Sequence, residues 1–265
     1  MRARGRRASY TAVAAIAVMG PVGPDAGSAR AAESRFWDEV DAGAVCQTRQ
    51  VMVVGLGSAR EAVTHLRVDR ARIGGRDVLR SVHRSPDPSR PQSDEMVVDA
   101  ATLRPISSVS TWAQPALRLE YDQREFRRVG ADGEILERAS LAEPAIPEGP
   151  GADIVIQAVA WREGLKFRGI MVDRWRGAAA SRLRPGFWSV EGRELLTTLQ
   201  GRQQVYRTRW RPDDGSYTFV TYVTVARPHH AARVEYSPRP GSVPIVSETS
   251  SFTSTCRGSK RRRRG

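Results

Sequence analysis

The stretch 217-YTFVTYVTV-225 decides the fold of this chain. Apolar and aromatic residues occupy both alternating sets of positions, with Tyr217, Phe219 and Val223 on one side and Val220 and Tyr222 on the other. Successive side chains of a strand point to opposite faces, so a strand with one face in water would alternate apolar and polar residues. We therefore predict a strand that is covered on both faces, in a sheet that curves around another element.

The sequence on either side of this stretch consists of short alternating runs separated by turn residues. Paired glycines at Gly74-Gly75 favour a hairpin between 62–73 and 76–83, and the segment 212–215 (PDDG) favours a turn between two further strands. Such a pattern is typical of antiparallel β structure. We predict a mainly β fold: a single curved antiparallel sheet, an open half-barrel, with one or two short helices.

The segment 152–161 (ADIVIQAVAW) is the best candidate for a helix inside that sheet. Ile154, Ala158 and Trp161 recur at helical spacing, and Asp153 is placed to cap the first turn. A fully buried strand is the alternative, because short apolar runs are ambiguous by periodicity. We expect the sheet to wrap around this segment.

Charge divides the 265-residue chain into three parts. The total of +13 comes from 42 Lys+Arg and 29 Asp+Glu; residues 1–31 contribute +4 and residues 257–265 contribute +6, which leaves +3 for 32–256. A GC-rich genome explains the preference for arginine over lysine, so the basic composition does not predict a nucleic-acid partner. We predict a signal peptide at 1–31, an antiparallel β domain at 32–256 and a disordered basic tail at 257–265.

The first 31 residues have the three parts of an export signal. Arginines at the start precede the apolar run 11–19, and the small-x-small pattern 29–31 (ARA) indicates cleavage before Ala32. An uncleaved anchor is the alternative, but nine apolar residues are too few to span a bilayer of roughly 30 Å. The expected mature protein is soluble and located in the periplasm or outside the cell.

Two cysteines lie near the two ends of the mature chain. In an oxidising compartment, a Cys46–Cys256 disulfide would tie the first long strand to the last. Two unpaired thiols are the alternative.

Aromatic residues concentrate in the second half of the chain. Ordinary packing of a β core explains them; the alternative is an aromatic-lined pocket for an apolar ligand, because ligand sites are usually concave and apolar. The candidate pocket residues are Trp161, Phe167, Trp175, Trp188, Trp210, Phe219 and Tyr222.

The C-terminal tail carries a dense cluster of cations, namely Lys260, Arg261, Arg262, Arg263 and Arg264. It is either an inert end, a contact to anionic lipid or lipopolysaccharide, or a contact to nucleic acid; the second suits an exported protein. Any affinity for polyanions is expected to lie in this tail.

Four parts of the sequence together resemble an exported bacterial domain family of unknown function: 96–105 (MVVDAATLRP), the hairpin 117–138, 143–161 (EPAIPEGPGADIVIQAVAW) and 192–194 (GRE). That family is similar to the lipoprotein-sorting proteins LolA and LolB. The resemblance implies an open, curved antiparallel sheet closed by helices over an apolar hollow. It implies no functional residues.

No strong catalytic or metal-binding motif is present in the sequence. The pair His229-His230 lacks further ligands at metal-binding spacing, and no serine lies in a nucleophile elbow. We therefore expect no catalytic residues, metal or cofactor. The first hypothesis is an exported, non-enzymatic envelope protein that holds a lipid, another apolar ligand or a lipidated protein. A structural or interaction protein without a ligand pocket is the alternative, and a hydrolase is the third.

Overall fold

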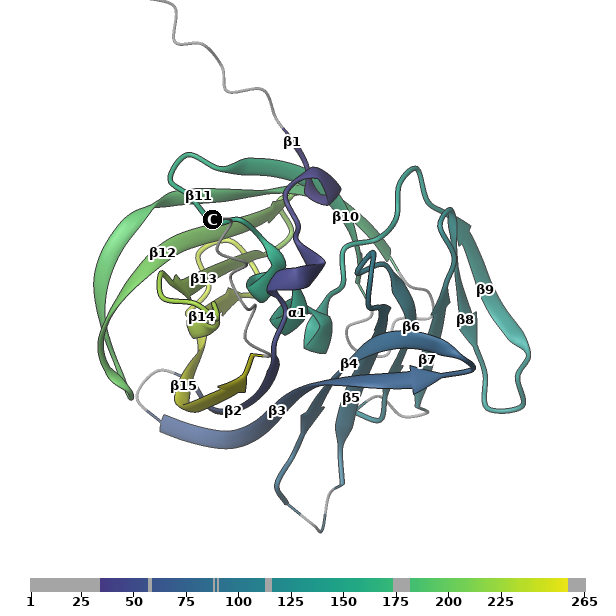
Figure 1. Cartoon of the computed structure of the whole chain (residues 1–265), viewed down its shortest axis with the longest axis horizontal. Helices are drawn as coiled ribbons and strands as arrows, with labels where there is room; N and C mark the ends of the chain where they lie inside the picture. Colours follow the sequence, from purple (N-terminus) through teal and green to yellow (C-terminus); the bar gives the residue numbers. More distant parts are fainter. Residues whose placement is uncertain are drawn as a thin grey trace, which may run out of the picture. The chain divides into compact units, whose positions relative to one another are not determined.

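The computed structural model describes residues 34–56, 59–87, 89, 91–112, 116–173 and 182–256, which belong to one compact unit. The expected signal peptide and basic tail lie outside these residues. Fifteen strands form one sheet among the described residues (Figure 1). Their bounds are β1 Ser34–Arg35, β2 Gln47–Leu56, β3 Ala59–Ile73, β4 Arg76–Arg84, β5 Ser93–Asp99, β6 Pro105–Ser110, β7 Leu117–Tyr121, β8 Glu125–Val129, β9 Ile135–Ser140, β10 Lys166–Asp173, β11 Arg182–Thr198, β12 Gly201–Pro212, β13 Thr218–Thr224, β14 Ala231–Ser237 and β15 Ile245–Thr255.

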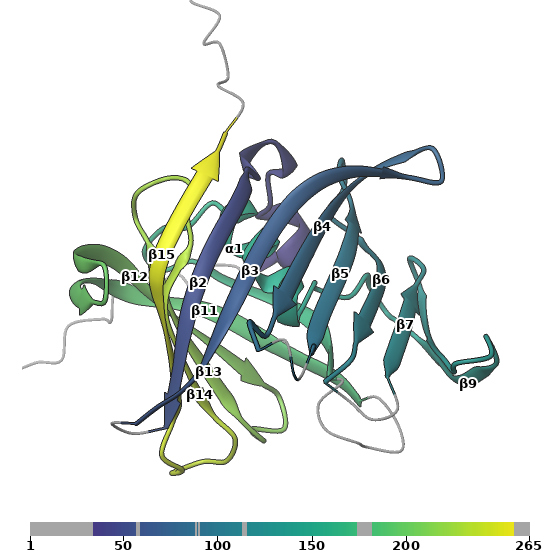
Figure 2. The same ribbon diagram turned by 90° about the horizontal axis from the view of Figure 1, so that it is seen from below.

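The sheet is built from two meanders that meet at a seam. Strands β2 to β9 pair in chain order, and so do β10 to β15; the two series join where β15 pairs with β2. All of these pairs are antiparallel, whereas the two-residue β1 runs parallel to β10. The sheet curves without closing into a barrel (Figure 2). The prediction of a mainly β fold with a single curved antiparallel sheet is therefore confirmed.

The predicted helix is confirmed, although it is shorter than expected. Helix α1 (Ala152–Ala158) follows the 3-10 turn η3 (Gly149–Gly151) and ends where Val159 becomes extended. Residues 154–158 are all buried, so the helix is covered on every side within the concave face of the sheet. The cap was predicted incorrectly: Gly151 is the N-cap, and the Asp153 carboxylate instead contacts His83 on β4.

Two further 3-10 turns lie beside the helix, η1 (Phe36–Asp38) and η2 (Ala42–Ala44). Phe36 is fully buried, and Val40 forms an isolated bridge with Val159 at the end of α1. The residues that precede β2 thus help α1 to fill the space inside the curve.

Strand β13 is covered on both faces, as its sequence predicted. Residues 220–224 are all buried. Val223 belongs to the largest apolar cluster, with α1, whereas Val220 and Tyr222 belong to a separate cluster on the opposite face with Val205 and Ala232. The inner face of β13 therefore packs against α1, whereas its outer face is buried by side chains of neighbouring strands in the same sheet.

No helix of the described part of the chain is long and apolar enough to cross a membrane.

Candidate functional site

The concave face of the sheet carries a continuous row of aromatic side chains. Direct cross-strand partners lead from Phe167 on β10 to Trp188, Trp210, Phe219 and Tyr236 on the four strands that follow. Because directly opposed residues share a face, all five rings lie on one side of the sheet. We call these five residues the aromatic row.

The buried end of the aromatic row is closely packed. Phe167, Trp188 and Trp210 are 0%, 5% and 0% exposed, and the two indoles have ring centroids 6.1 Å apart. Trp161, which follows α1, lies 5.8 Å from Trp188 and donates its indole N–H to the carbonyl of Ile156. At this end, rings from the chain itself fill the hollow.

The other end of the row is partly accessible. Phe219 and Tyr236 stack with centroids 4.7 Å apart, and Tyr217 makes an edge contact to each of them. All three rings are half-buried. The Arg184 guanidinium lies 5.9 Å from the centre of the Tyr217 ring, so a cation borders this aromatic patch.

The predicted pocket residues thus have three different outcomes. Trp161, Phe167, Trp188 and Trp210 lie together in one buried cluster, and Phe219 packs against it. Tyr222 lies on the opposite face of the sheet, because it differs in parity from Phe219 along β13. Trp175 lies outside the described residues. Tyr217 and Tyr236 were missed, although the alternation in 217–225 already placed Tyr217 beside Phe219.

A smaller polar group occupies the concave face near β4. His83 Nε2 lies 2.8 Å from Asp153 Oδ2, which ties α1 to the sheet. Ser81 precedes His83 by two residues on the same face, at a spacing of about 6.7 Å along a strand. A general base must lie within hydrogen-bond distance of the group that it activates, so this spacing does not make Ser81 a nucleophile for His83.

No metal centre is formed by the described residues: they contain no group of three or more His, Cys, Asp or Glu side chains arranged to hold an ion. His229 and His230 are instead part of the turn between β13 and β14. His229 Nδ1 lies 2.7 Å from the carbonyl oxygen of Thr224, and His230 stacks on Phe252 of β15 at 3.9 Å.

The pKa of His230 is lowered to about 4: burial is the main cause and the nearby His229 contributes, whereas hydrogen bonding to the backbone of Pro228 and the charge of Asp153 oppose the shift. The unfolded chain binds this proton below about pH 6.5 and the folded chain does not. The stability from a neutral His230 is thus complete above pH 6.5 and lost as the pH falls toward 4.

We expect the free energy of unfolding to fall by about 2 kcal/mol between pH 7 and 4.5 on account of His230. Urea unfolding of wild type and His230→Gln at both pH values measures this, and the variant is expected to lose that part of the pH dependence. His65→Gln is the control, because His65 is exposed on β3. An unchanged pH dependence in His230→Gln contradicts the prediction.

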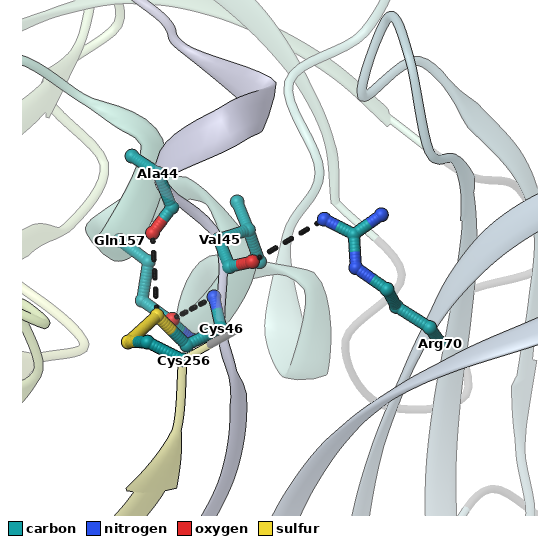
Figure 3. Close-up of a disulfide and its surroundings, with 6 residues drawn as sticks. All are labelled: Ala44, Val45, Cys46, Arg70, Gln157 and Cys256. Atoms are coloured by element: carbon teal, nitrogen blue, oxygen red, sulfur yellow. Dashed lines mark hydrogen bonds between the residues drawn. A yellow bond between two sulfur atoms is a disulfide. The ribbon is translucent and has the colours of Figure 1, made fainter. Parts of the chain in front are cut away.

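The seam between the two meanders is closed by a disulfide. Cys46 directly precedes Gln47 and Cys256 directly follows Thr255, the pair that ends the β15–β2 ladder, and the two cysteines are bonded with a Cα–Cα distance of 4.7 Å (Figure 3). The predicted bridge is therefore confirmed. The backbone N–H of Cys46 also donates to Gln157 Oε1 at 2.9 Å, which connects the seam to α1.

A shallow hollow of about 330 Å³ lies on the outer face of the sheet, near the seam. Its lining includes Arg49 of β2, His65 and Arg67 of β3, and Ser251 and Thr253 of β15. Arg49, His65 and Arg67 alternate with buried Gln50 and Leu66 along their strands, so the hollow faces away from α1.

No protein-family model matches the chain, and no curated protein sequence matches it. Among solved structures, it is similar to a beta-barrel-like protein of a domain of unknown function, DUF1849, from Brucella abortus. That similarity has a TM-score of 0.47 and 11% identity, and it covers 79% of this chain and 98% of the other. A structure described as a "putative lipoprotein" from Parabacteroides distasonis has a TM-score of 0.38 and 9% identity, covering 83% and 99%.

The curved antiparallel sheet that the resemblance implied is present in this chain. The fold itself rests on the strand order described above.

Proposed function

We propose that this protein is an exported, non-enzymatic interaction protein of the cell envelope, which binds partners through the outer surface of its sheet. The packing of the aromatic row carries this proposal. Phe167, Trp188 and Trp210 are at most 5% exposed. A hollow that is filled by the protein's own side chains to this degree serves as a core, because interiors of folded proteins are close-packed.

Export is supported by two independent features. The first 31 residues have the pattern of a signal peptide, and the Cys46–Cys256 bridge suits an oxidising compartment. N-terminal sequencing of protein collected outside the cytoplasm is expected to begin at Ala32 or within a few residues of it. An intact Met1 in that material contradicts the cleavage of a signal peptide during export.

A second candidate function, the binding of an apolar ligand or a lipidated protein, is supported by the open end of the aromatic row. Tyr217, Phe219 and Tyr236 are half-buried. The indole nitrogens of Trp188 and Trp210 are buried and have no hydrogen-bond partner among the described residues. Buried donors normally find an acceptor, and a carbonyl or hydroxyl oxygen of a ligand would supply one.

Extraction of the purified protein with organic solvent, followed by lipid mass spectrometry, distinguishes the two functions. We expect a clean extract, in agreement with a filled core. A co-purifying acyl species at a stoichiometric level contradicts the proposal of an interaction protein and supports the second function, the binding of an apolar ligand.

The basic tail is expected to act separately from the folded domain. Deleting residues 257–265 removes a net charge of +6. We expect this deletion to abolish binding to anionic vesicles at low salt, because clustered cations near an anionic surface gain roughly 1 kcal/mol each. Vesicle co-sedimentation measures the loss.

The same deletion is expected to leave the thermal midpoint nearly unchanged, because an arginine run buries no apolar surface. A large fall in the midpoint contradicts the expectation that the tail does not stabilise the domain. Unchanged vesicle binding contradicts the expectation that the tail binds anionic vesicles.

A further inference from the structure

The hollow near the seam is built on three strands, β15, β2 and β3, which lie side by side (Figure 2). Thr253 of β15 pairs with Arg49 of β2, and Arg49 pairs with Arg67 of β3. Ser251 and His65 lie in the next row, as partners of one and the same β2 residue. Because directly opposed residues share a face of the sheet, these five side chains surround one outward-facing hollow of about 330 Å³.

A difference in side-chain length and a bulge give the hollow its depth. The lining combines the long side chains of Arg49 and Arg67 with the short ones of Val51 and Ser251. The pairing of β15 with β2 shifts next to Ser251, and the bulged Ser250 donates its hydroxyl to the Val51 carbonyl at 3.2 Å. Bulges increase the local twist of a strand and redirect its side chains, and they are common beside binding and active sites.

Two guanidinium groups face each other across the hollow. Arg49 and Arg67 are direct cross-strand partners, and like charges in this position destabilise a sheet. Asp69 relieves only part of the repulsion, because its carboxylate contacts Arg67 at Nε, 2.5 Å away, and that contact does not use the two Nη groups. Arg49 makes no ion pair with a residue that the structure describes. An anion placed between the two arginines would therefore stabilise both of them.

No carboxylate lines the hollow. Arg84, which is directly opposite His65 on β4, borders it and, like Arg49, makes no ion pair within the described part of the chain. The carboxylates on the surrounding outer surface are each engaged by an arginine: Asp69 by Arg67, Glu95 by Arg80, and Glu235 and Glu248 by Arg233.

We infer that this hollow binds a phosphate monoester, with the phosphate group between Arg49 and Arg67. The inference rests on the proposed function, since it places recognition on the outer surface of the sheet. Arginine presents a planar fork of N–H donors that matches phosphate geometry. The hydroxyls of Ser251 and Thr253 and the imidazole of His65 supply further donors, which suits the three terminal oxygens of a phosphate monoester.

The size and the charge of the hollow narrow the class of ligand. A volume of about 330 Å³ exceeds that of a phosphate group alone and reaches the lower end of the range for small-molecule sites, so a small organic group attached to the phosphate also has room. Guanidinium groups repel metal ions and organic cations. An apolar ligand would leave those groups without an anionic partner.

The experiment measures the affinity of the full chain for glucose 6-phosphate by isothermal titration calorimetry at 50 mM salt. We compare wild type with Arg49→Gln. This variant is expected to bind about 5-fold more weakly, as for the loss of an exposed ion pair. The basic tail is unchanged in the variant, so its contribution cancels in the comparison.

Arg138→Gln is the matched control for net charge. Arg138 lies on β9 at the edge of the sheet, and its side chain is 57% exposed. This variant removes the same charge far from the seam, so it is expected to bind glucose 6-phosphate as wild type does. An equal loss of affinity in Arg138→Gln and Arg49→Gln overturns the inference.

A second variant keeps the test valid if Arg49→Gln does not fold. Thr253→Val preserves the shape and the β-branching of the side chain but removes the hydroxyl, and it is expected to weaken binding about 3-fold. It then takes the place of Arg49→Gln in every comparison.

Glucose 6-sulfate tests the charge of the ligand. A sulfate ester carries one negative charge, whereas a phosphate monoester carries roughly 1.5 to 2 at pH 7. We expect wild type to bind the sulfate ester several-fold more weakly than the phosphate ester. Equal affinities overturn the assignment to a phosphate monoester.

Phosphatidylcholine vesicles that contain phosphatidic acid distinguish a lipid headgroup from a soluble compound, because phosphatidic acid carries the same phosphate monoester. A loss in Arg49→Gln with glucose 6-phosphate supports a soluble ligand, and a loss confined to the vesicles supports a lipid headgroup. No loss with either probe overturns the inference. If the lipid extract is clean, such a failure leaves the proposed function intact, whereas an acyl species in the extract contradicts the proposed function itself.

Discussion

Reduction of the Cys46–Cys256 disulfide is expected to lower the free energy of unfolding by about 2–5 kcal/mol. The bridge closes a loop with a sequence separation of 210 residues, and long loops gain most in the chain-entropy account. The bond also lies beside the only ladder that joins the two meanders of the described sheet. Its loss therefore weakens the pairing on which the whole sheet depends.

Thermal unfolding with and without a reducing agent measures this effect. One kcal/mol corresponds to about 2–4 °C for a domain of this size, so the midpoint is expected to fall by roughly 5–15 °C. The control is the double variant Cys46→Ser, Cys256→Ser, which should match the reduced wild type and be insensitive to reductant. Equal midpoints for oxidised and reduced wild type contradict the prediction.

Trp210→Ala is expected to cost about 3–5 kcal/mol of unfolding free energy. Trp210 is fully buried at the centre of the aromatic row, between Trp188 on β11 and Phe219 on β13. Removal of the indole leaves a cavity that these neighbours fill only in part, which adds to the lost burial of apolar surface. Denaturant unfolding at pH 7 measures the loss.

Trp112→Ala is the matched control for this substitution. Trp112 is 42% exposed, so the same change is expected to cost less than about 1 kcal/mol. The loss of unfolding free energy for Trp210→Phe should fall between the losses for Trp210→Ala and Trp112→Ala, because this variant keeps an aromatic ring in the row. Stability of Trp210→Ala within 1 kcal/mol of wild type would mean that the row is loosely packed, and would favour a ligand cavity.

Local sequence signals predicted the elements of the fold well. The Gly74-Gly75 pair indicated the β3–β4 hairpin, where both glycines adopt positive φ, and apolar residues at both sets of alternating positions identified β13 as a strand covered on both faces. The cysteines even indicated which distant strands meet, since a Cys46–Cys256 bridge requires the start of β2 to lie beside the end of β15. These signals depend on a few neighbouring residues or on a covalent bond.

Features that depend on the register between distant strands were not predictable. Tyr236 was missed because only its pairing with Phe219, across β13 and β14, places it in the aromatic row. Tyr222, in contrast, was grouped with Phe219 as pocket lining although the pattern of 217–225 already placed the two on opposite sides of the strand, where the structure has them.

The seam has a consequence for the order of folding events. Each meander contains only hairpins between consecutive strands, which form from local contacts, whereas the β2–β15 ladder joins residues about two hundred positions apart. Contacts of such high sequence separation are slow to form. Because β15 is the last strand, the sheet is completed only after the whole domain has emerged, and a circular permutant that begins at β10 and ends at β9 would convert this slowest step into a hairpin.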